Sequence, residues 1–269
     1  MTETFDDAWL ALREEIDHRS RAASLLPTLL DWWTAASHSA VLDLGCGTGS
    51  NLRYLAPKLP GRQTWTLVDH DAALLGHVEA PGSDVRVRLV QGDLAGAGLE
   101  EIARADLVTA SALLDLVSET WAKALIDTCV SVGCGALFSL TYDGRIEWSP
   151  EDPFDAFVLD AVNEHQRRDK GTGPALGPTA ARTAQELFRR QGYRTWLSDS
   201  AWRVGESEAA LAEALHTGWA TAAVEVRPDD ADAVERWAER RRVAIVGGEV
   251  ELVVGHQDLL ALPVGPGPS

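Results

Sequence analysis

The sequence lacks a long hydrophobic run and a recognisable export signal. No window of the 269 residues approaches the ~18 consecutive apolar residues of a membrane span. The N-terminus, MTETFDDAWLALREE, is acidic and has no basic segment followed by an apolar core. These absences argue against membrane insertion and secretion, so we expect a cytoplasmic protein with no membrane partner.

Cysteine and basic residues are also scarce. Cys46, Cys129 and Cys134 have no metal-ligand spacing, which fits a reducing compartment and predicts no metal site. Lys and Arg number 24 against 41 Asp and Glu, for a formal net charge of −17 and a pI near 4.7. Because phosphate contacts require a basic surface, this charge argues against a nucleic-acid partner.

What the sequence does contain is an alternation of strand-like and helix-like segments. Strands are predicted over 40–45, 64–69, 85–91, 105–110 and 135–142, with helices over 51–55, 71–78 and 119–131. This order predicts a doubly wound α/β fold, with a mainly parallel sheet and helices on both faces. The segment VRVRLVQ (85–91) alternates apolar residues with arginine and is expected at a sheet edge.

The flanking segments continue the fold on both sides of this region. Residues 5–35 have helical spacing, and Pro27 is expected to divide them into two helices. After Tyr142 the regular pattern stops until residue 178, apart from a helical patch around 154–168. The later elements predicted are helices over 179–191, 206–222 and 230–242 and strands over 193–198 and 249–254, the last extendable toward Leu262. Trp202, Trp219, Trp237 and His256 are expected in the core, and residues 265–269 as a frayed tail.

The stretch VLDLGCGTGSN (41–51) carries the strongest functional signal. A buried strand leads into Gly45, Gly47 and Gly49, and a helix follows. Glycine permits positive φ and close approach of a ligand, and a helix N-terminus offers free N–H groups. Asp69, 22 residues after Gly47 at the end of the next strand, is placed to bind a ribose diol. The pattern therefore predicts a nucleotide-like ligand, with a ligand-free tight turn as the alternative.

The glycine spacing distinguishes between two kinds of nucleotide site. The dinucleotide fingerprint Gly-x-Gly-x-x-Gly requires a glycine at position 50, where this chain has Ser50. The observed LDLGCGTG instead resembles motif I of the class I S-adenosylmethionine-dependent methyltransferases. The segments LVDHD (67–71), QGDL (91–94) and ADLVTASALLDLVS (105–118) are similar, in order, to the next motifs of that superfamily. The resemblance covers about residues 40–142.

The resemblance implies a Rossmann-like sheet of seven strands, the last antiparallel, within a single domain over residues 1–264. A helical lid is implied over 1–36, a cofactor-binding core over 37–142, an acceptor-site insertion over 143–178 and the rest of the sheet, with helical insertions, over 179–264. It also implies S-adenosylmethionine as cofactor and S-adenosylhomocysteine as product. The implied cofactor-binding residues are Asp43, Gly45, Cys46, Gly47, Gly49, Asn51, Asp69, His70, Asp93, Leu94 and Ser111. Arg13, Arg19 and Arg21 are candidates to meet the methionine carboxylate, or lie on a solvated helix face.

Methyl transfer needs little chemistry from side chains. It is an in-line displacement in which alignment dominates, and a general base is needed only for a protonated acceptor. No HExxH, GxSxG, CxxC or P-loop lysine is present, and TASALL stands where nucleic-acid and glutamine N-methyltransferases carry (Asp/Asn)-Pro-Pro-(Tyr/Phe). Asp115, Tyr142 and His165 are the candidate catalytic residues; Asp115 either contacts the acceptor or caps the following segment.

The basic segment NEHQRRDKGTGPALGP (163–178) stands out in so acidic a chain. With the residues after Tyr142 it supplies the candidate acceptor-binding residues Asp143, Trp148, Arg167, Arg168 and Lys170. Arginine suits bidentate binding of carboxylate or phosphate. The alternative is a solvated helix end with its cations at the C-terminus and Gly171 as cap.

The sequence therefore predicts methyl transfer from S-adenosylmethionine to a small-molecule acceptor, with an anionic acceptor as one option. Two alternatives stay open. One is an NAD(P)-dependent oxidoreductase on a similar sheet, and the other is a methyltransferase-like protein that only binds a partner. Binding of S-adenosylhomocysteine, and not of NAD, would separate the first from the leading hypothesis.

Overall fold

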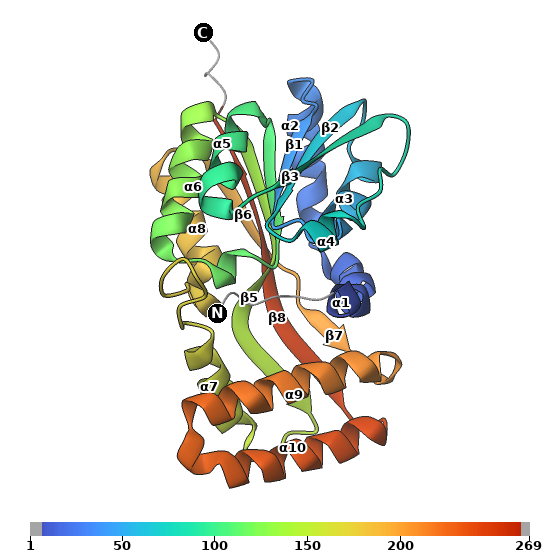
Figure 1. The fold of residues 1–269 in the computed structure, drawn as a ribbon, viewed down its shortest axis with the longest axis vertical. Helices are drawn as coiled ribbons and strands as arrows, with labels where there is room; N and C mark the ends of the chain where they lie inside the picture. Colours follow the sequence, from blue (N-terminus) through green and yellow to red (C-terminus); the bar gives the residue numbers. More distant parts are fainter. Residues whose placement is uncertain (1–6, 265–269) are drawn as a thin grey trace.

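The computed structural model describes residues 7–264; residues 1–6 of the predicted lid and the predicted tail 265–269 lie outside the described residues. One sheet has the strand order β3-β2-β1-β4-β5-β8-β6, with short β7 paired to β8 (Figure 1). The strands are β1 (Ala40–Leu44), β2 (Gln63–Asp69), β3 (Val85–Gln91), β4 (Leu107–Ser111), β5 (Gly135–Ser149), β6 (Arg194–Asp199), β7 (Trp202–Val204) and β8 (Glu251–Leu262).

The predicted fold class is confirmed by this topology. β1 to β5 run parallel, and β8 is antiparallel to both β5 and β6, so the last strand is reversed as expected. β3 lies at the sheet edge, as its alternation of apolar residues and arginine predicted. The carboxyl ends of β1, β2, β3 and β4 therefore meet along one edge of the sheet, where ligands bind in such folds.

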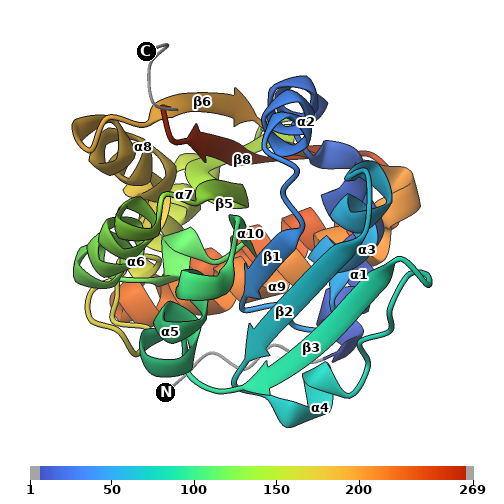
Figure 2. The ribbon, with the colours of Figure 1, turned by 90° about the horizontal axis from the view of Figure 1, so that it is seen from above.

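Helices cover both faces of the sheet (Figure 2). Leu42 and Val108 face a core shared with α6 and α8, whereas Val41 and Leu107 face the core beneath α2 and α3. The central strands are apolar on both faces, which is why they read as continuous hydrophobic runs. The helices on this part of the fold are α2 (Leu26–Ala35), α3 (Ser50–Leu55), α4 (Ala72–Leu75), α5 (Leu99–Glu101), α6 (Glu119–Val132) and α8 (Ala180–Arg190).

The predicted end of the fifth strand at Tyr142 is wrong. β5 continues to Ser149 and pairs with the first half of β8, with Ile146 opposite Val254 and Trp148 opposite Leu252. Ile146 and Trp148, two residues apart, are both buried. This alternation is typical of a strand and is present in the sequence. Register shifts between Phe138 and Thr141 and between Tyr142 and Ile146 interrupt that signal.

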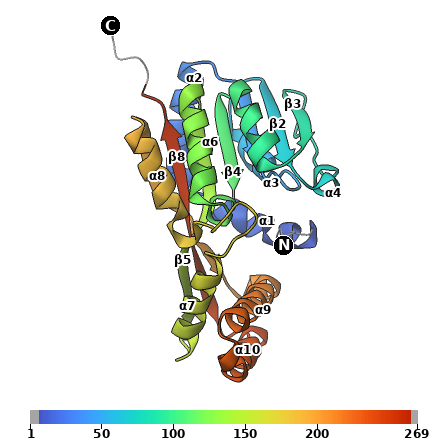
Figure 3. The ribbon, with the colours of Figure 1, turned by 60° about the vertical axis from the view of Figure 1, so that its left-hand side comes forward.

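The extended β5–β8 ribbon carries a second lobe below the main sheet (Figures 1 and 3). This lobe contains β7, α7 (Asp155–His165), α9 (Ala209–Val226) and α10 (Ala231–Val246). Trp202 and Trp237 are buried in its apolar core and Trp219 packs against that core, so the core assignment of these three tryptophans is confirmed. Trp148 is buried in the same core. None of the helices within residues 7–264 is long and apolar enough to cross a membrane.

Helix α1 (Asp7–Ser20) lies between the two parts of the molecule (Figure 3). Its Glu14 accepts hydrogen bonds from Arg53 of α3, and its Arg19 pairs with Glu208, which precedes α9, at 2.7 Å. The N-terminal helices separate at residues 21–25, not at Pro27, which lies in the first turn of α2. Proline is favourable there because the first-turn N–H groups have no partner within the helix.

Candidate active site

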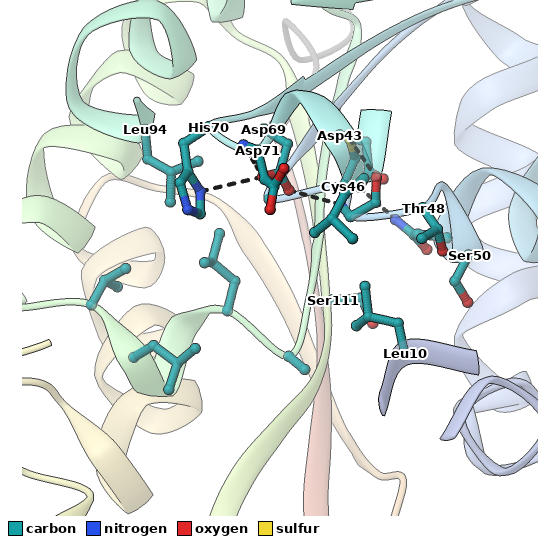
Figure 4. A pocket seen from close by; sticks show the side chains of 18 of the residues that line it. Leu10, Asp43, Cys46, Thr48, Ser50, Asp69, His70, Asp71, Leu94 and Ser111 are labelled. Carbon is teal, nitrogen blue, oxygen red and sulfur yellow. Dashed lines mark hydrogen bonds and ion pairs between the residues drawn. The ribbon is translucent and has the colours of Figure 1, made fainter. Parts of the chain in front are cut away.

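A cavity of about 570 Å³ lies at the carboxyl edge of the sheet, beside α1 (Figure 4). Its volume is suitable for a ligand of cofactor size. Most of the cofactor-binding residues predicted from the sequence line it, together with one predicted acceptor-binding residue. They are Asp43, Gly45, Cys46, Gly47, Asn51, Asp69, His70, Asp93, Leu94, Ser111 and Lys170.

The glycine turn has a backbone conformation that would be strained for residues other than glycine. Gly45 and Gly47 have φ values of 63° and 53°, in the left-handed region. A Cβ added at Gly47 would lie 3.1 Å from the Leu10 side chain of α1, so the turn and α1 approach closely. Gly49, with φ of 82°, caps the N-terminus of α3 and is not among the residues that line the cavity.

Asp69 is held on the cavity wall by backbone donors. Its Oδ2 accepts a hydrogen bond of 2.8 Å from the Gly47 N–H, and its Oδ1 accepts one of 3.0 Å from the Asp71 N–H. The His70 Nδ1 lies 3.3 Å from Oδ1 (Figure 4). The carboxylate therefore links the end of β2 to the glycine turn and has a fixed orientation beside the cavity.

Asp43 begins a buried polar network behind the glycine turn. Its Oδ1 accepts hydrogen bonds of 2.8 Å from both Asn51 and Thr109, and Asn51 in turn accepts one of 2.9 Å from Arg21. Burial raises the pKa of Asp43 to about 6, although Asn51 and Thr109 act in the opposite direction. Within residues 7–264 its buried Oδ2 has no hydrogen-bond partner. Asp43 is also among the residues that line the cavity.

The raised pKa of Asp43 makes the stability of the ligand-free protein depend on pH. Because the folded-state pKa of about 6 lies above the ordinary value of 3.8, the folded state binds this proton more tightly. The resulting stabilisation is complete below the ordinary value and is lost as pH rises through about 6. We expect the wild type to lose about 1 kcal/mol of unfolding free energy relative to Asp43→Asn between about pH 5 and pH 7.5. Urea unfolding of both proteins at each pH measures this difference; a constant difference would contradict it.

Several lining residues were not predicted from the sequence. Helix α1 contributes Leu10 and Asp17, the segment after β4 contributes Ala112, Leu113, Leu116 and Val117, and the segment after α7 contributes Gly171 and Thr172. Thr48, Ser50, Asp71, Leu74 and Ala95 extend the walls around the predicted motif residues. Leu10, Asp17, Leu74 and Ala95 lie outside the quoted motifs, whereas Thr48, Ser50, Asp71 and the four residues after β4 lie within them but were not singled out.

The lid arginines have three different positions. Arg13 lines the cavity, with its Nε 2.9 Å from Asp17 Oδ2 and its guanidinium 5.0 Å from the ring centroid of Trp202. Arg21 is buried in the Asp43 network, and Arg19 pairs with Glu208. Of the three candidates for a methionine carboxylate, the structure therefore brings only Arg13 to the cavity.

The three candidate catalytic residues do not line the cavity. The Tyr142 hydroxyl donates a hydrogen bond of 3.0 Å to Asn163 Oδ1 of α7, and burial raises the pKa of this phenol. His165 lies 3.2 Å from Glu225 of α9. Asp115 is buried in the short 3-10 turn Leu114–Leu116, whose flanking residues line the cavity. Their catalytic roles stay predictions that the cavity lining does not support.

Four of the five candidate acceptor-binding residues also lie elsewhere. Trp148 packs in the core of the second lobe, and Asp143 pairs with Arg145. Arg167 donates to the Asn163 carbonyl near the end of α7, and Arg168 pairs with Glu225. Arg167 and Arg168 thus lie just after the end of α7 and do not line the cavity, and their roles stay predictions.

Gly171 does not cap α7, because the helix ends at His165. It lies in the following loop, where Asp169 Oδ1 accepts hydrogen bonds from the N–H groups of Gly171 and Gly173. This loop brings Lys170 to the cavity. The basic segment therefore divides into a helix end and a short piece of cavity wall.

Residues 41–133 match the family model described as a methyltransferase domain. This region contains the glycine turn, Asp69, Asp93 and the segment after β4. The chain therefore contains a methyltransferase domain, of the class I S-adenosylmethionine-dependent type, over these residues. The resemblance predicted from the sequence motifs is thereby confirmed at the level of the superfamily. None of the curated proteins compared with this methyltransferase matches its sequence significantly.

Several solved structures resemble this methyltransferase at low sequence identity. A cyclopropane-fatty-acyl-phospholipid synthase-like protein from Lactobacillus casei has a TM-score of 0.51 and 15% identity, over 97% of this methyltransferase and 95% of that chain. Phosphoethanolamine N-methyltransferase 2 from Haemonchus contortus has a TM-score of 0.45 and 11% identity, over 96% of this methyltransferase. The methyltransferase spans only 58% of the length of that enzyme. A methyltransferase from Geobacter sulfurreducens with bound S-adenosylhomocysteine has a TM-score of 0.41 and 16% identity, over 94% and 98% of the two chains.

Proposed function

We propose that this methyltransferase transfers the methyl group of S-adenosylmethionine to a small-molecule acceptor that binds in the same cavity. The observation that carries the proposal is the composition of the cavity wall. The glycine turn and the strand-end carboxylates of β1 to β3 line one part, and the segment after β4 with Lys170 lines another. One cavity thus offers a cofactor region and a separate acceptor region.

The residues of the first region fit S-adenosylmethionine. Gly47 has a positive φ and lies close to Leu10 of α1, Asp69 presents a fixed carboxylate suited to ribose hydroxyls, and the buried Asp43 Oδ2 suits a ligand donor. Leu94 and Ala95 supply an apolar surface for an aromatic ring, beside Asp93. When bound, the cofactor supplies an electrophilic methyl group on a sulfonium.

The contribution of the protein is alignment and exclusion of water. The acceptor's lone pair attacks the methyl carbon as the carbon–sulfur bond breaks, and the bonding electrons remain on sulfur. Ser111 ends β4 and Ala112 follows it, so in chain order both lie between the residues of the first region and Leu113. Ala112 has a φ of 52°, a strained value for a non-glycine residue, and its N–H donates to the Ser139 carbonyl. We infer that this strained turn sets the position of the acceptor, because such strain is concentrated at functional sites.

Two measurements test the proposed function. Calorimetric titration with S-adenosylhomocysteine should show binding, and titration with NAD should show none; the reverse result would support the oxidoreductase alternative. A screen of small metabolites with labelled S-adenosylmethionine should then identify an acceptor by transfer of label. Cofactor binding without transfer to any acceptor would favour the binding-protein alternative.

A further inference from the structure

Helix α1 presents two different sides to its neighbours. Leu10 lies close to the glycine turn, and Glu14 accepts hydrogen bonds from α3. Ile16, by contrast, is buried in the core of the second lobe. Consecutive helical residues are separated by about 100° around the helix axis, so Arg13 and Asp17 lie between these two sides. Both residues line the cavity.

Arg13 and Asp17 form an ion pair on the cavity wall. The Arg13 Nε donates a hydrogen bond of 2.9 Å to the Asp17 Oδ2, and the Nη2 donates one of 3.2 Å to Oδ1. The side chains of Arg13 and Asp17 are only 12% and 10% exposed, so the pair is held against the protein. Each carboxylate oxygen has more than one lone pair, and a guanidinium has further N–H groups on Nη1. Both members of the pair can therefore also bind a ligand.

The buried carboxylate of Asp17 favours a positively charged neighbour. Burial raises the pKa of this carboxyl, whereas Arg13, Arg21 and His18 act in the opposite direction. The direction of the net shift shows that these neighbours do not fully compensate for the loss of water around the charge. A further cation in the cavity would stabilise the ionised form of Asp17.

The amino-acid end of the cofactor carries one charge of each sign. Its ammonium and its carboxylate are attached to the same carbon atom, so their partners in the protein must be neighbours. Arg13 and Asp17 are neighbours of opposite charge on the cavity wall, on the helix whose Leu10 lies close to the glycine turn. Asp43 lies behind that turn and accepts a hydrogen bond from Asn51 instead.

We propose that Asp17 binds the ammonium group of the methionine moiety of S-adenosylmethionine, beside the carboxylate at Arg13. This inference rests on the proposed function and adds a residue of α1 that determines cofactor specificity. A ligand with a carboxylate and no ammonium would be attracted by Arg13 and repelled by Asp17. The pair therefore selects an amino acid over a simple carboxylic acid.

The test compares four ligands by calorimetric titration. They are S-adenosylhomocysteine, its analogue without the amino group, its analogue without the carboxylate, and 5′-methylthioadenosine, which has neither. The wild type should bind S-adenosylhomocysteine about tenfold more tightly than the analogue without the amino group. Asp17→Asn should weaken binding of the two ligands that carry the ammonium about tenfold and should not weaken binding of the other two. Asparagine keeps an oxygen that accepts from Arg13, so this change removes mainly the charge.

A control on the same helix accompanies this variant. Glu15→Gln should leave all four affinities at their wild-type values, because Glu15 is an exposed acid of α1 that does not line the cavity. Asp17→Ser also removes the charge, and it gives the same expectation if Asp17→Asn does not fold. Binding of 5′-methylthioadenosine checks that the adenosine region of each variant is intact.

Three outcomes would overturn the inference. They are an unchanged S-adenosylhomocysteine affinity in the folded Asp17 variant, equal weakening of S-adenosylhomocysteine and the analogue without the amino group, and equal wild-type affinities for these two ligands. Equal weakening would show that Asp17 acts only by orienting Arg13, since both ligands carry the carboxylate. Failure of the wild type to bind S-adenosylhomocysteine would instead contradict the proposed function.

Discussion

Asp69→Ala is expected to weaken S-adenosylhomocysteine binding by ~1.5–3 kcal/mol, or roughly ten- to one-hundredfold. The carboxylate of Asp69 is buried, oriented by the N–H groups of Gly47 and Asp71, and faces the cavity. Charged hydrogen bonds to two ribose hydroxyls account for an effect of that size. Calorimetric titration of both proteins with S-adenosylhomocysteine measures it.

A second substitution separates loss of ribose contacts from damage to the glycine turn. Asp69→Asn keeps an oxygen that can accept from the Gly47 N–H but removes the charge, so its affinity should lie between those of wild type and Asp69→Ala. Asp84→Ala is the control, since Asp84 is an exposed acid outside the cavity lining. Wild-type affinity in a folded Asp69→Ala protein would show that Asp69 does not bind the cofactor.

Arg13→Gln is expected to weaken S-adenosylhomocysteine binding about tenfold or more and to leave 5′-methylthioadenosine binding unchanged. The two ligands share the adenosine and the sulfur, but only the first carries a carboxylate. Arg13 lines the cavity, and its ion pair with Asp17 holds the guanidinium on the wall. A loss confined to the longer ligand therefore reports directly on the methionine carboxylate.

The matched control for this experiment lies on the same helix. Arg19→Gln removes an arginine that pairs with Glu208 outside the cavity, so the affinities of both ligands should stay at their wild-type values. Equal weakening of both ligands by Arg13→Gln would indicate that Arg13 only stabilises α1, through Asp17 and Trp202. The ratio of the two affinities thus separates ligand contact from a structural role.

Local sequence patterns predicted a set of candidate cofactor residues that the structure brings together. The strand, glycine turn and helix of residues 40–55 form from neighbouring residues, and parallel strands place Asp69 beside Gly47 through their register. Positive φ at Gly45 and Gly47 restricts which residues can occupy the turn. The motif therefore encodes its own geometry, and the predicted cofactor residues cluster in one cavity.

The predicted acceptor-binding residues are not brought together, because distant contacts decide where each of them lies. Arg167, Arg168 and Lys170 lie almost side by side in the sequence, yet Arg168 pairs with Glu225 while Lys170 lines the cavity. Trp148 reads as a candidate recognition residue, but the extension of β5 past its bulges buries it in the second lobe. Neither outcome follows from composition or spacing.

The sequence by itself determined the fold class, the edge position of β3 and the form of the glycine turn, since each depends on local periodicity or on the φ preference of glycine. Only the tertiary structure decided that Arg13, and neither Arg19 nor Arg21, reaches the cavity, and that Lys170 is the cation of the basic segment that does so. These choices depend on packing between α1, the segment after β4 and the loop after α7. Packing of that kind joins residues far apart in the chain, so no local pattern records it.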